Sequence, residues 1–406
     1  LGALASDNVP AKANADGFAG LAALTGKSNF DISEWMVRAL LEGLAGRDAT
    51  VAMLCKTSVA RKLLAFAWRT GQPLASAALY RIDADAHFGA SVDACLLVCR
   101  LAPRAPAAAA CPVFDRLAAD APVASLGYRG GRLIADVALY DQWAMLDRTA
   151  ASAPGRRHHW RSGIKHDCAA VMELRRTPTG FASRAGDVVG DVAVGAPTDG
   201  DADLEDHWLY PLWKSSEVAR GRADDPPRYL LVTQARVGDD TQAIEASAPR
   251  TWRYLTRHRA RFDRRASAIY RGKPPFAIFG VGDYTFAPWK VAISGLYKKL
   301  AFCVVGPHDG KPVVFDDTCY FLPCASEAEA RVIAELLASE PAQQFYASQV
   351  FWDAKRPITT ELLRRLDLDR LAALLGRALA PTEATAAGAM PPGSEAAPAS
   401  RSARTA

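Results

Sequence analysis

The chain has 406 residues, half of them hydrophobic, which is enough for two or three domains with a core each. Charged residues make up 23% and the net charge is +5, so the overall charge neither indicates nor excludes a polyanionic partner. No run of roughly 18 or more apolar residues occurs, which argues against a membrane-spanning helix.

The first 28 residues are rich in Gly, Ala, Asn and Ser and predict a loop, with no sign of a signal peptide. A chain that opens at Leu1 in such a loop is expected to be a fragment. Five regular elements are then predicted: a helix at 29–46, a strand at 49–56, a helix at 58–71 and strands at 76–82 and 92–101. The order indicates half of an α/β sheet covered on both faces. The last two strands are joined by only about nine residues, so they are expected to pair antiparallel.

A low-complexity segment at 102–112 predicts a linker, and beyond it the strands become shorter and the charges denser. Strands are expected at 123–128, 132–138, 170–176, 228–234, 276–281, 301–305, 312–315 and 318–322. Helices are expected at 139–148, 247–265, 326–338, 341–349 and 359–376. Residues 381–406 are mostly Ala, Pro and Ser and predict a disordered tail.

The eight cysteines are scattered and include no CxxC pair, which is typical of reduced thiols in a cytoplasmic protein. Four metal-ligating residues do lie near one another in sequence, namely Cys303, His308, Cys319 and Cys324. Their spacing matches no common zinc pattern, so cysteines that fill apolar positions on strands are expected and a metal site is not.

Residues 252–273 form the densest basic segment, with eight Lys or Arg against one acid and four interleaved aromatic residues. This mixture is typical of a surface that follows a phosphate backbone. The alternative is a solvated amphipathic helix whose arginine stems cover apolar surface. The segment 280–300 combines glycines, aromatic residues and three lysines. It either approaches a phosphate closely or is a plain turn between strands.

Three further positions suggest ligand contacts. Phe88 directly precedes a predicted buried strand, at a sheet edge where a ring could stack on a flat ligand, although such a residue is more often part of the core. Lys165 and Lys214 lie beside small residues in predicted loops, a setting suited to gripping an anion. His166 and Asp167 invite an acid–base interpretation, but no nucleophile with a matching third partner is evident.

Several of these segments, in this order, resemble one protein family. They are "NFDISEWM", "TVAMLCKTSVARKLL", "SAALYRIDADAHFGASVDACLLVCR", "SGIKHDC" and "LYPLWKSSEV". The family is the adenine-specific DNA methyltransferases of restriction–modification systems, the gamma type related to the Eco57I and TaqI enzymes. The resemblance implies an α/β chain with a partial Rossmann-like methyltransferase sheet, followed by a mixed α+β target-recognition domain. Residues 1–101 would be the second half of the catalytic domain and 113–380 the recognition domain.

The resemblance also implies S-adenosylmethionine as cofactor, double-stranded DNA as partner and a cognate restriction endonuclease beside it. The family's glycine-rich cofactor motif and its catalytic Asn-Pro-Pro-aromatic tetrapeptide do not occur in these residues. The tetrapeptide would be expected just before Leu1. The chain is therefore expected to hold no catalytic residue and, on its own, to methylate nothing.

The resemblance assigns roles to particular residues. Phe88 would stack on the extruded adenine, since it aligns with the family's aromatic residue ahead of the seventh strand. Lys27, Ser28 and Asn29 would lie near that base. DNA contacts are expected from a basic set: Lys165, Lys214, Arg257, Arg261, Arg264, Arg265 and Lys290.

Three alternatives remain open from the sequence. One is a non-catalytic DNA-specificity protein with the same architecture. Another is part of a fused restriction endonuclease and methyltransferase. A third is an RNA-modifying enzyme.

Overall fold

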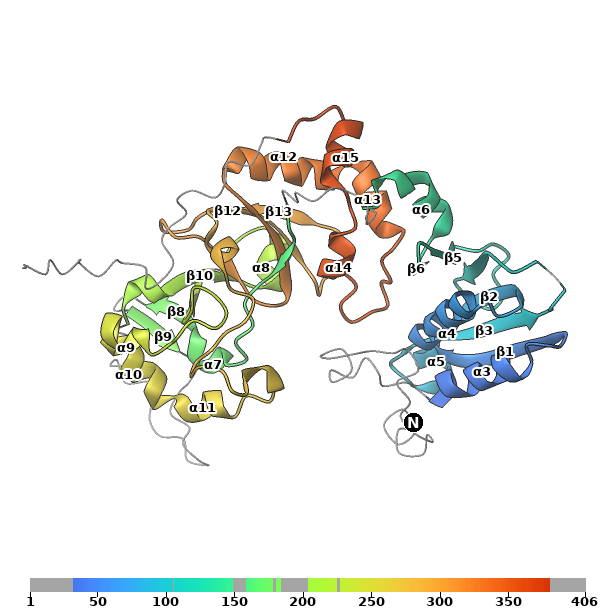
Figure 1. The fold of residues 1–406 in the computed structure, drawn as a ribbon, viewed down its shortest axis with the longest axis horizontal. Coiled ribbons are helices and arrows are strands. Elements are labelled where there is room, and N and C mark those ends of the chain that lie inside the picture. Colours follow the sequence, from blue (N-terminus) through green and yellow to red (C-terminus); the bar gives the residue numbers. More distant parts are fainter. Residues whose placement is uncertain are drawn as a thin grey trace, which may run out of the picture. The chain divides into compact units, whose positions relative to one another are not determined.

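The computed structural model describes residues 32–104, 106–148, 158–177, 180–183, 204–224 and 227–379. The chain forms two compact units. Unit 1 comprises Leu1–Ala144 with Gln344–Pro357, and unit 2 comprises Met145–Gln343 with Ile358–Ala406. Both units contain helices and sheets, which confirms the predicted α/β class (Figure 1).

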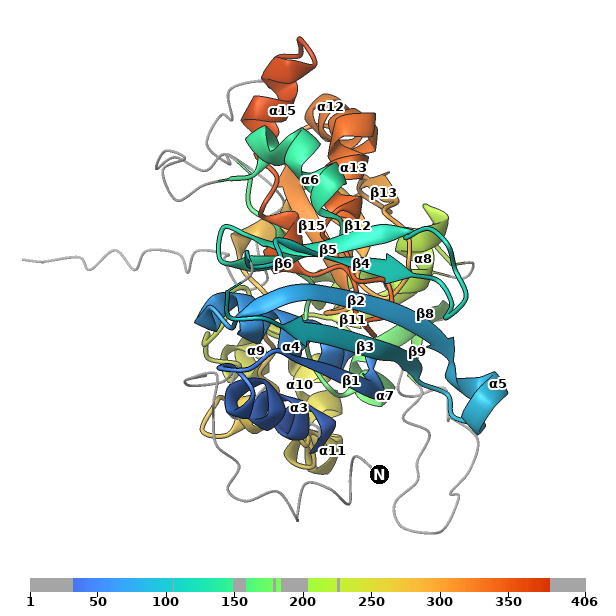
Figure 2. The same cartoon turned by 90° about the vertical axis from the view of Figure 1, so that its right-hand side faces the viewer.

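Unit 1 is built on a six-stranded sheet in the order β1-β3-β2-β4-β5-β6 (Figure 2). The strands are β1 Ala49–Lys56, β2 Leu74–Asp83, β3 Asp93–Leu101, β4 Ala110–Phe114, β5 Ala124–Arg129 and β6 Arg132–Ile134. β3 lies between β1 and β2 and is antiparallel to both, which confirms the predicted antiparallel pair. β4 runs parallel to β2 and extends the sheet.

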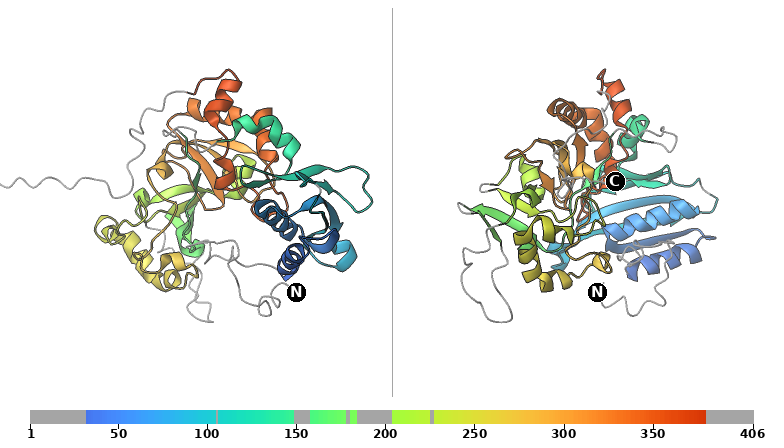
Figure 3. Two further views of the ribbon diagram at one scale, coloured as in Figure 1. Left: turned by 45° about the vertical axis from the view of Figure 1, so that its right-hand side comes forward. Right: turned by 60° about the vertical axis from the view of Figure 1, so that its left-hand side comes forward.

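Two helices, α3 Ile32–Gly43 and α4 Thr57–Thr70, lie side by side on one face of this sheet (Figure 3). α4 ends where Gly71 adopts φ +65°, a left-handed conformation that glycine takes without strain. On the other side of β1, Thr50, Ala52, Leu54 and Lys56 are exposed, so no part of the chain that the structure describes covers this side of the strand.

The predicted linker at 102–112 lies inside unit 1. β4 begins at Ala110 and buries Cys111 and Val113 in the same core as β1–β3, so burial of these side chains draws the segment into the sheet. The returning segment 344–357 also belongs to this unit. The indole of Trp143 donates to Gln344 Oε1 at 2.6 Å, and Arg61 pairs with Asp353.

Unit 2 contains a five-stranded sheet, β14-β10-β11-β8-β9, and a four-stranded sheet, β13-β12-β15-β7. The strands are β7 Arg161–Ser162, β8 Glu173–Thr177, β9 Gly180–Ser183, β10 Leu209–Trp213, β11 Arg228–Leu231, β12 Trp289–Ser294, β13 Phe302–Val305, β14 Val314–Phe315 and β15 Cys319–Cys324. One core lies around Tyr229 and Phe276, and another around Phe315 and Phe321.

Helices lie between some of these strands and also follow the last of them. The remaining helices of the described residues are α5 Ala84–Phe88, α6 Val137–Trp143, α7 Ala169–Met172, α8 Ser215–Arg220, α9 Ala243–Ser247, α10 Pro249–Arg257, α11 Arg259–Asp263, α12 Glu327–Ala338, α13 Glu340–Ala347, α14 Thr360–Leu363 and α15 Leu368–Leu374. Single turns of 3-10 helix lie at η1 Ala144–Leu146, η2 Asp206–Trp208, η3 Ala268–Tyr270 and η4 Asp283–Phe286. The predicted helix at 247–265 thus divides at His258, and no strand forms at 276–281.

Candidate nucleic-acid interface

Phe88 is the last residue of α5, and four residues separate it from Asp93, where β3 begins. Asp83 caps this short helix by accepting the Ala86 amide at 3.0 Å, and Gly89 ends it at φ +60°. The Phe88 side chain is 60% exposed, so the core interpretation does not hold. The centre of its ring lies 6.1 Å from that of His87. Lys27, Ser28 and Asn29 lie outside the described residues.

In unit 2, the segment 163–168 is held by backbone contacts on both sides. The Ile164 amide donates to Phe315 O at 2.7 Å, and Lys165 and Phe279 exchange two backbone hydrogen bonds at 2.9 Å. A Cβ at Gly163 would overlap the carbonyl oxygens of Phe315 and Asp316. Glycine is therefore required here for close approach of two backbones rather than for a turn.

The side chains of this segment are also engaged. Lys165 Nζ lies 2.7 Å from Asp167 Oδ1, and Asp167 adopts φ +50°. His166 is buried, its Nδ1 accepts the Cys168 amide at 3.2 Å, and its Nε2 lies 3.5 Å from Glu173 Oε1. His166 thus anchors the segment to β8.

Glu173 brings the two predicted lysine segments together. Lys214 Nζ donates to Glu173 Oε1 at 2.8 Å and lies 3.7 Å from Asp316 Oδ2. Burial alone would raise the pKa of the Glu173 carboxyl, but hydrogen bonds from His166 and Lys214 outweigh it and hold the pKa at about 2. Sequence reasoning missed Glu173, although an acid inside the apolar stretch "AAVMEL" was a usable signal.

The predicted basic residues of α10 and α11 differ in exposure. Arg257 and Arg264 are exposed, and Arg261 is half-buried. Arg265 is half-buried too, and it donates to the carbonyls of His166 at 3.2 Å and Ala277 at 2.7 Å. Its guanidinium also lies 3.6 Å from the centre of the Tyr270 ring. Arg265 therefore ties the segment 163–168 to the basic segment.

Lys290 corrects the sequence prediction. The side chain is 1% exposed on β12, and its Nζ donates to Ala287 O at 2.6 Å. Burial lowers the pKa of this ammonium to about 7. A group so enclosed does not reach a DNA phosphate, and the apolar neighbours of a central strand explain why it is enclosed.

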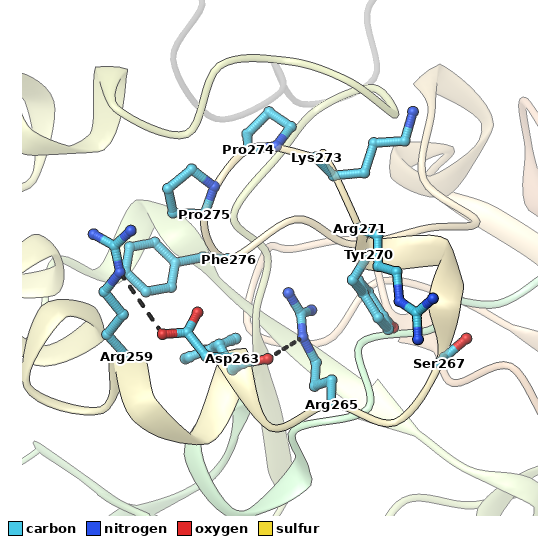
Figure 4. Close-up of a pocket in the computed structure, with 11 residues that line it drawn as sticks. Arg259, Asp263, Arg265, Ser267, Tyr270, Arg271, Lys273, Pro274, Pro275 and Phe276 are labelled. Atoms are coloured by element: carbon cyan, nitrogen blue, oxygen red, sulfur yellow. Dashed lines mark hydrogen bonds and ion pairs between the residues drawn. The ribbon is translucent and has the colours of Figure 1, made fainter.

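A pocket of about 380 Å³ opens beside Arg265 (Figure 4). It is lined by Arg259, Phe262, Asp263, Arg265, Ser267, Tyr270, Arg271, Lys273, Pro274, Pro275 and Phe276. Arg259 lies 4.0 Å from Asp263, whereas Arg271 and Lys273 are exposed and have no ion-pair partner among the described residues. The lining holds four cations and one carboxylate, a charge balance that favours an anion over a cation.

Within the described ranges, no group of three or more His, Cys, Asp or Glu is arranged to hold a metal ion. The eight cysteines all lie within those ranges, and none of them forms a disulfide there. No helix there is both long and apolar enough to cross a membrane.

Comparisons with known proteins give one strong relative. A Type II methyltransferase, M.NspV, from Nostoc sp. is 42% identical over 374 residues, which cover 92% of this chain and 74% of that protein. No family model matches the chain. Among solved structures, the Type IIL restriction-modification enzyme MmeI in complex with DNA superposes with a TM-score of 0.44 at 11% identity. That match covers 91% of this chain and about half (52%) of the MmeI chain, and so low a score does not establish a shared fold.

Proposed function

The chain belongs to the family of Type II methyltransferases, and from that premise we propose that its protein transfers a methyl group from S-adenosylmethionine to the N6 amino group of an adenine in double-stranded DNA. The observation that supports this proposal is the position of Phe88, which is 60% exposed at the end of α5, with four residues between it and Asp93, where β3 begins. A target base must leave the duplex to be methylated, and an exposed ring at a sheet edge can stack on it there. The choice of adenine rests on the resemblance of the motifs.

The cofactor would supply an electrophilic methyl group on its sulfonium. In the described part of unit 1, β1 continues directly into α4 without the glycine-rich turn that would hold such a cofactor between a strand and a helix. We therefore assign no residue of the chain to the cofactor. Phe88 would hold the base, and residues 27–29 would lie near it.

We assign DNA recognition to unit 2. The exposed Arg257 and Arg264 and the half-buried Arg261 suit contacts to the phosphate backbone. Lys165 pairs with Asp167 and Lys214 pairs with Glu173, so each lysine would contact DNA from a fixed position. Arg265 would hold the neighbouring segments in place.

From the same family membership we propose that the protein is cytoplasmic and protects DNA from a cognate restriction endonuclease. In such a system, methylation marks the recognition sequence that the endonuclease would otherwise cut. The endonuclease partner is proposed from family membership alone.

The test is to incubate the full gene product with DNA and labelled S-adenosylmethionine, then digest the DNA and identify the methylated nucleoside by mass spectrometry. We expect N6-methyladenine. Methylated cytosine would refute the adenine assignment, methylation of RNA alone would favour an RNA-modifying enzyme, and DNA binding without methylation would favour a specificity protein. The position of the mark should map to one short sequence.

Phe88→Ala should lower kcat/KM roughly 5- to 150-fold, since stacking of a base on an aromatic ring contributes about 1–3 kcal/mol. Phe88→Tyr should retain most of the activity. Leu117→Ala is the matched control, because Leu117 is 55% exposed in the same unit. Equal activity of Phe88→Ala and the control would remove Phe88 from the site.

A further inference from the structure

The connection between β12 and β13 presents two large apolar side chains to solvent. Leu296 is 39% exposed and Tyr297 is 49% exposed. Lys298 and Lys299 follow directly, and neither has an ion-pair partner within the described ranges. Apolar and cationic groups therefore share one protruding tip, residues 295–299.

The tip is held in a defined conformation at its base. Gly295 N donates to Thr318 O at 2.8 Å, and Ser294 Oγ accepts the amides of Leu296 at 3.2 Å and Tyr297 at 3.3 Å. A Cβ at Gly295 would lie 2.7 Å from Tyr320 Cε2, so the backbone packs directly on that ring. A pre-organised tip loses little conformational entropy when it binds.

The anchor of the tip also belongs to the Lys214 site. Ser215 Oγ donates to Thr318 Oγ1 at 2.8 Å, and the Thr318 amide donates to Asp316 Oδ1 at 3.2 Å. Asp316 in turn lies 3.7 Å from Lys214 Nζ. The tip and the Lys214 segment are thus fixed to the same short stretch of chain, 316–318.

We propose that the tip, residues 295–299, is a DNA-groove contact in which Leu296 and Tyr297 pack against base edges or a base step. Lys298 and Lys299 then contact the flanking phosphates. Proteins that enter a groove commonly use an apolar wedge bordered by cations, because the wedge gains surface contact while the cations release counterions. The inference rests on the proposed function, since it takes DNA as the ligand.

Two double variants of the full gene product separate the two parts of this contact. Binding to a fluorescein-labelled 30-base-pair duplex of mixed sequence is followed by anisotropy at several salt concentrations. Leu296→Ala with Tyr297→Ala should weaken binding about tenfold without changing the salt dependence, since apolar contacts release no counterions. Lys298→Ala with Lys299→Ala should reduce the slope of log K against log salt by up to about two.

Leu374→Ala with Leu375→Ala is the matched control, because these side chains are 49% and 38% exposed elsewhere in unit 2. It should bind as the parent protein does. If both tip variants bind with the parent affinity and slope, the proposal is wrong. The binding assay contains no cofactor, so weakened binding by the tip variants supports the DNA contact of the tip even if the protein transfers no methyl group. If the protein methylates DNA but the tip variants bind as the parent does, only the proposed contact of the tip is wrong.

Discussion

Lys290 shows how burial alone changes the chemistry of a side chain. Burial lowers the pKa of its ammonium from about 10.4 in an unfolded chain to about 7 in β12. Between these values the unfolded chain holds a proton that the folded chain has lost. The free energy of unfolding therefore rises with pH across this window, and below about pH 7 the folded protein bears the full cost of a buried charge.

We expect Lys290→Met to remove this pH dependence. The variant should be more stable than the parent protein near pH 7, and the difference should shrink by roughly 1.4 kcal/mol per pH unit toward pH 10. Urea unfolding followed by tryptophan fluorescence at pH 7, 8 and 9 measures it. Lys298→Met, at an exposed lysine of the same unit, should show no such trend. A stability difference that stays constant over this range would contradict the assigned titration.

At the scale of elements, the sequence correctly predicted the helices and strands in which buried residues recur at the regular spacing of a helix or a strand. The strand Ala49–Lys56 forms with the predicted bounds, and α4 lies within one residue of them. The apolar run at 276–281 instead forms no strand, because side chains take its backbone groups. Thr233 Oγ1 donates to Phe276 O at 2.7 Å, and Gln234 Oε1 accepts the Ile278 amide at 2.8 Å. Such long-range competition leaves no trace in the local sequence.

The close packing of the segment 163–168 against β14 should make the stability of the protein sensitive to any side chain added at Gly163. Gly163→Ala should lower the free energy of unfolding by about 1–3 kcal/mol or more, because the added methyl group overlaps two carbonyl oxygens of the backbone that cannot move aside cheaply. Thermal unfolding of the two proteins measures the difference. The variant should also weaken DNA binding, because Lys165 lies in this segment and His166 of the segment contacts Glu173, which holds Lys214.

Gly310→Ala is the control for that substitution. Gly310 adopts φ +73° with open space around a Cβ, so the variant carries only the cost of the left-handed backbone, about 1 kcal/mol. A Gly163→Ala protein no less stable than Gly310→Ala would mean that the segment and β14 can separate freely.

At the scale of the whole molecule, the net charge of +5 over 406 residues conceals where the charge lies. The basic segment 252–273 and the segments around Lys165 and Lys214 can be recognised in the sequence alone. The sequence did not predict that Glu173 joins Lys214 to His166, because these residues come together only when β8 and β10 take their places beside β11. Nor did it predict the loss of Lys290 to the core, which depends on what covers β12.

Because the charge is unevenly distributed, we expect DNA binding to depend on where a cation lies rather than on the total charge of the protein. Arg271→Ala with Lys273→Ala removes two exposed cations from the pocket of Figure 4. If the pocket receives a DNA phosphate, the slope of log K against log salt should fall by up to about two, and affinity should weaken similarly for all duplex sequences.

Arg331→Ala with Arg377→Ala removes the same charge from elsewhere in unit 2. These two side chains are exposed but already paired, with Glu327 and Glu335. Because both double variants lower the net charge equally, a long-range effect of total charge would change both slopes alike. Only a phosphate bound at the pocket changes the first slope and leaves the second at the parent value, so the comparison decides whether the pocket contacts DNA.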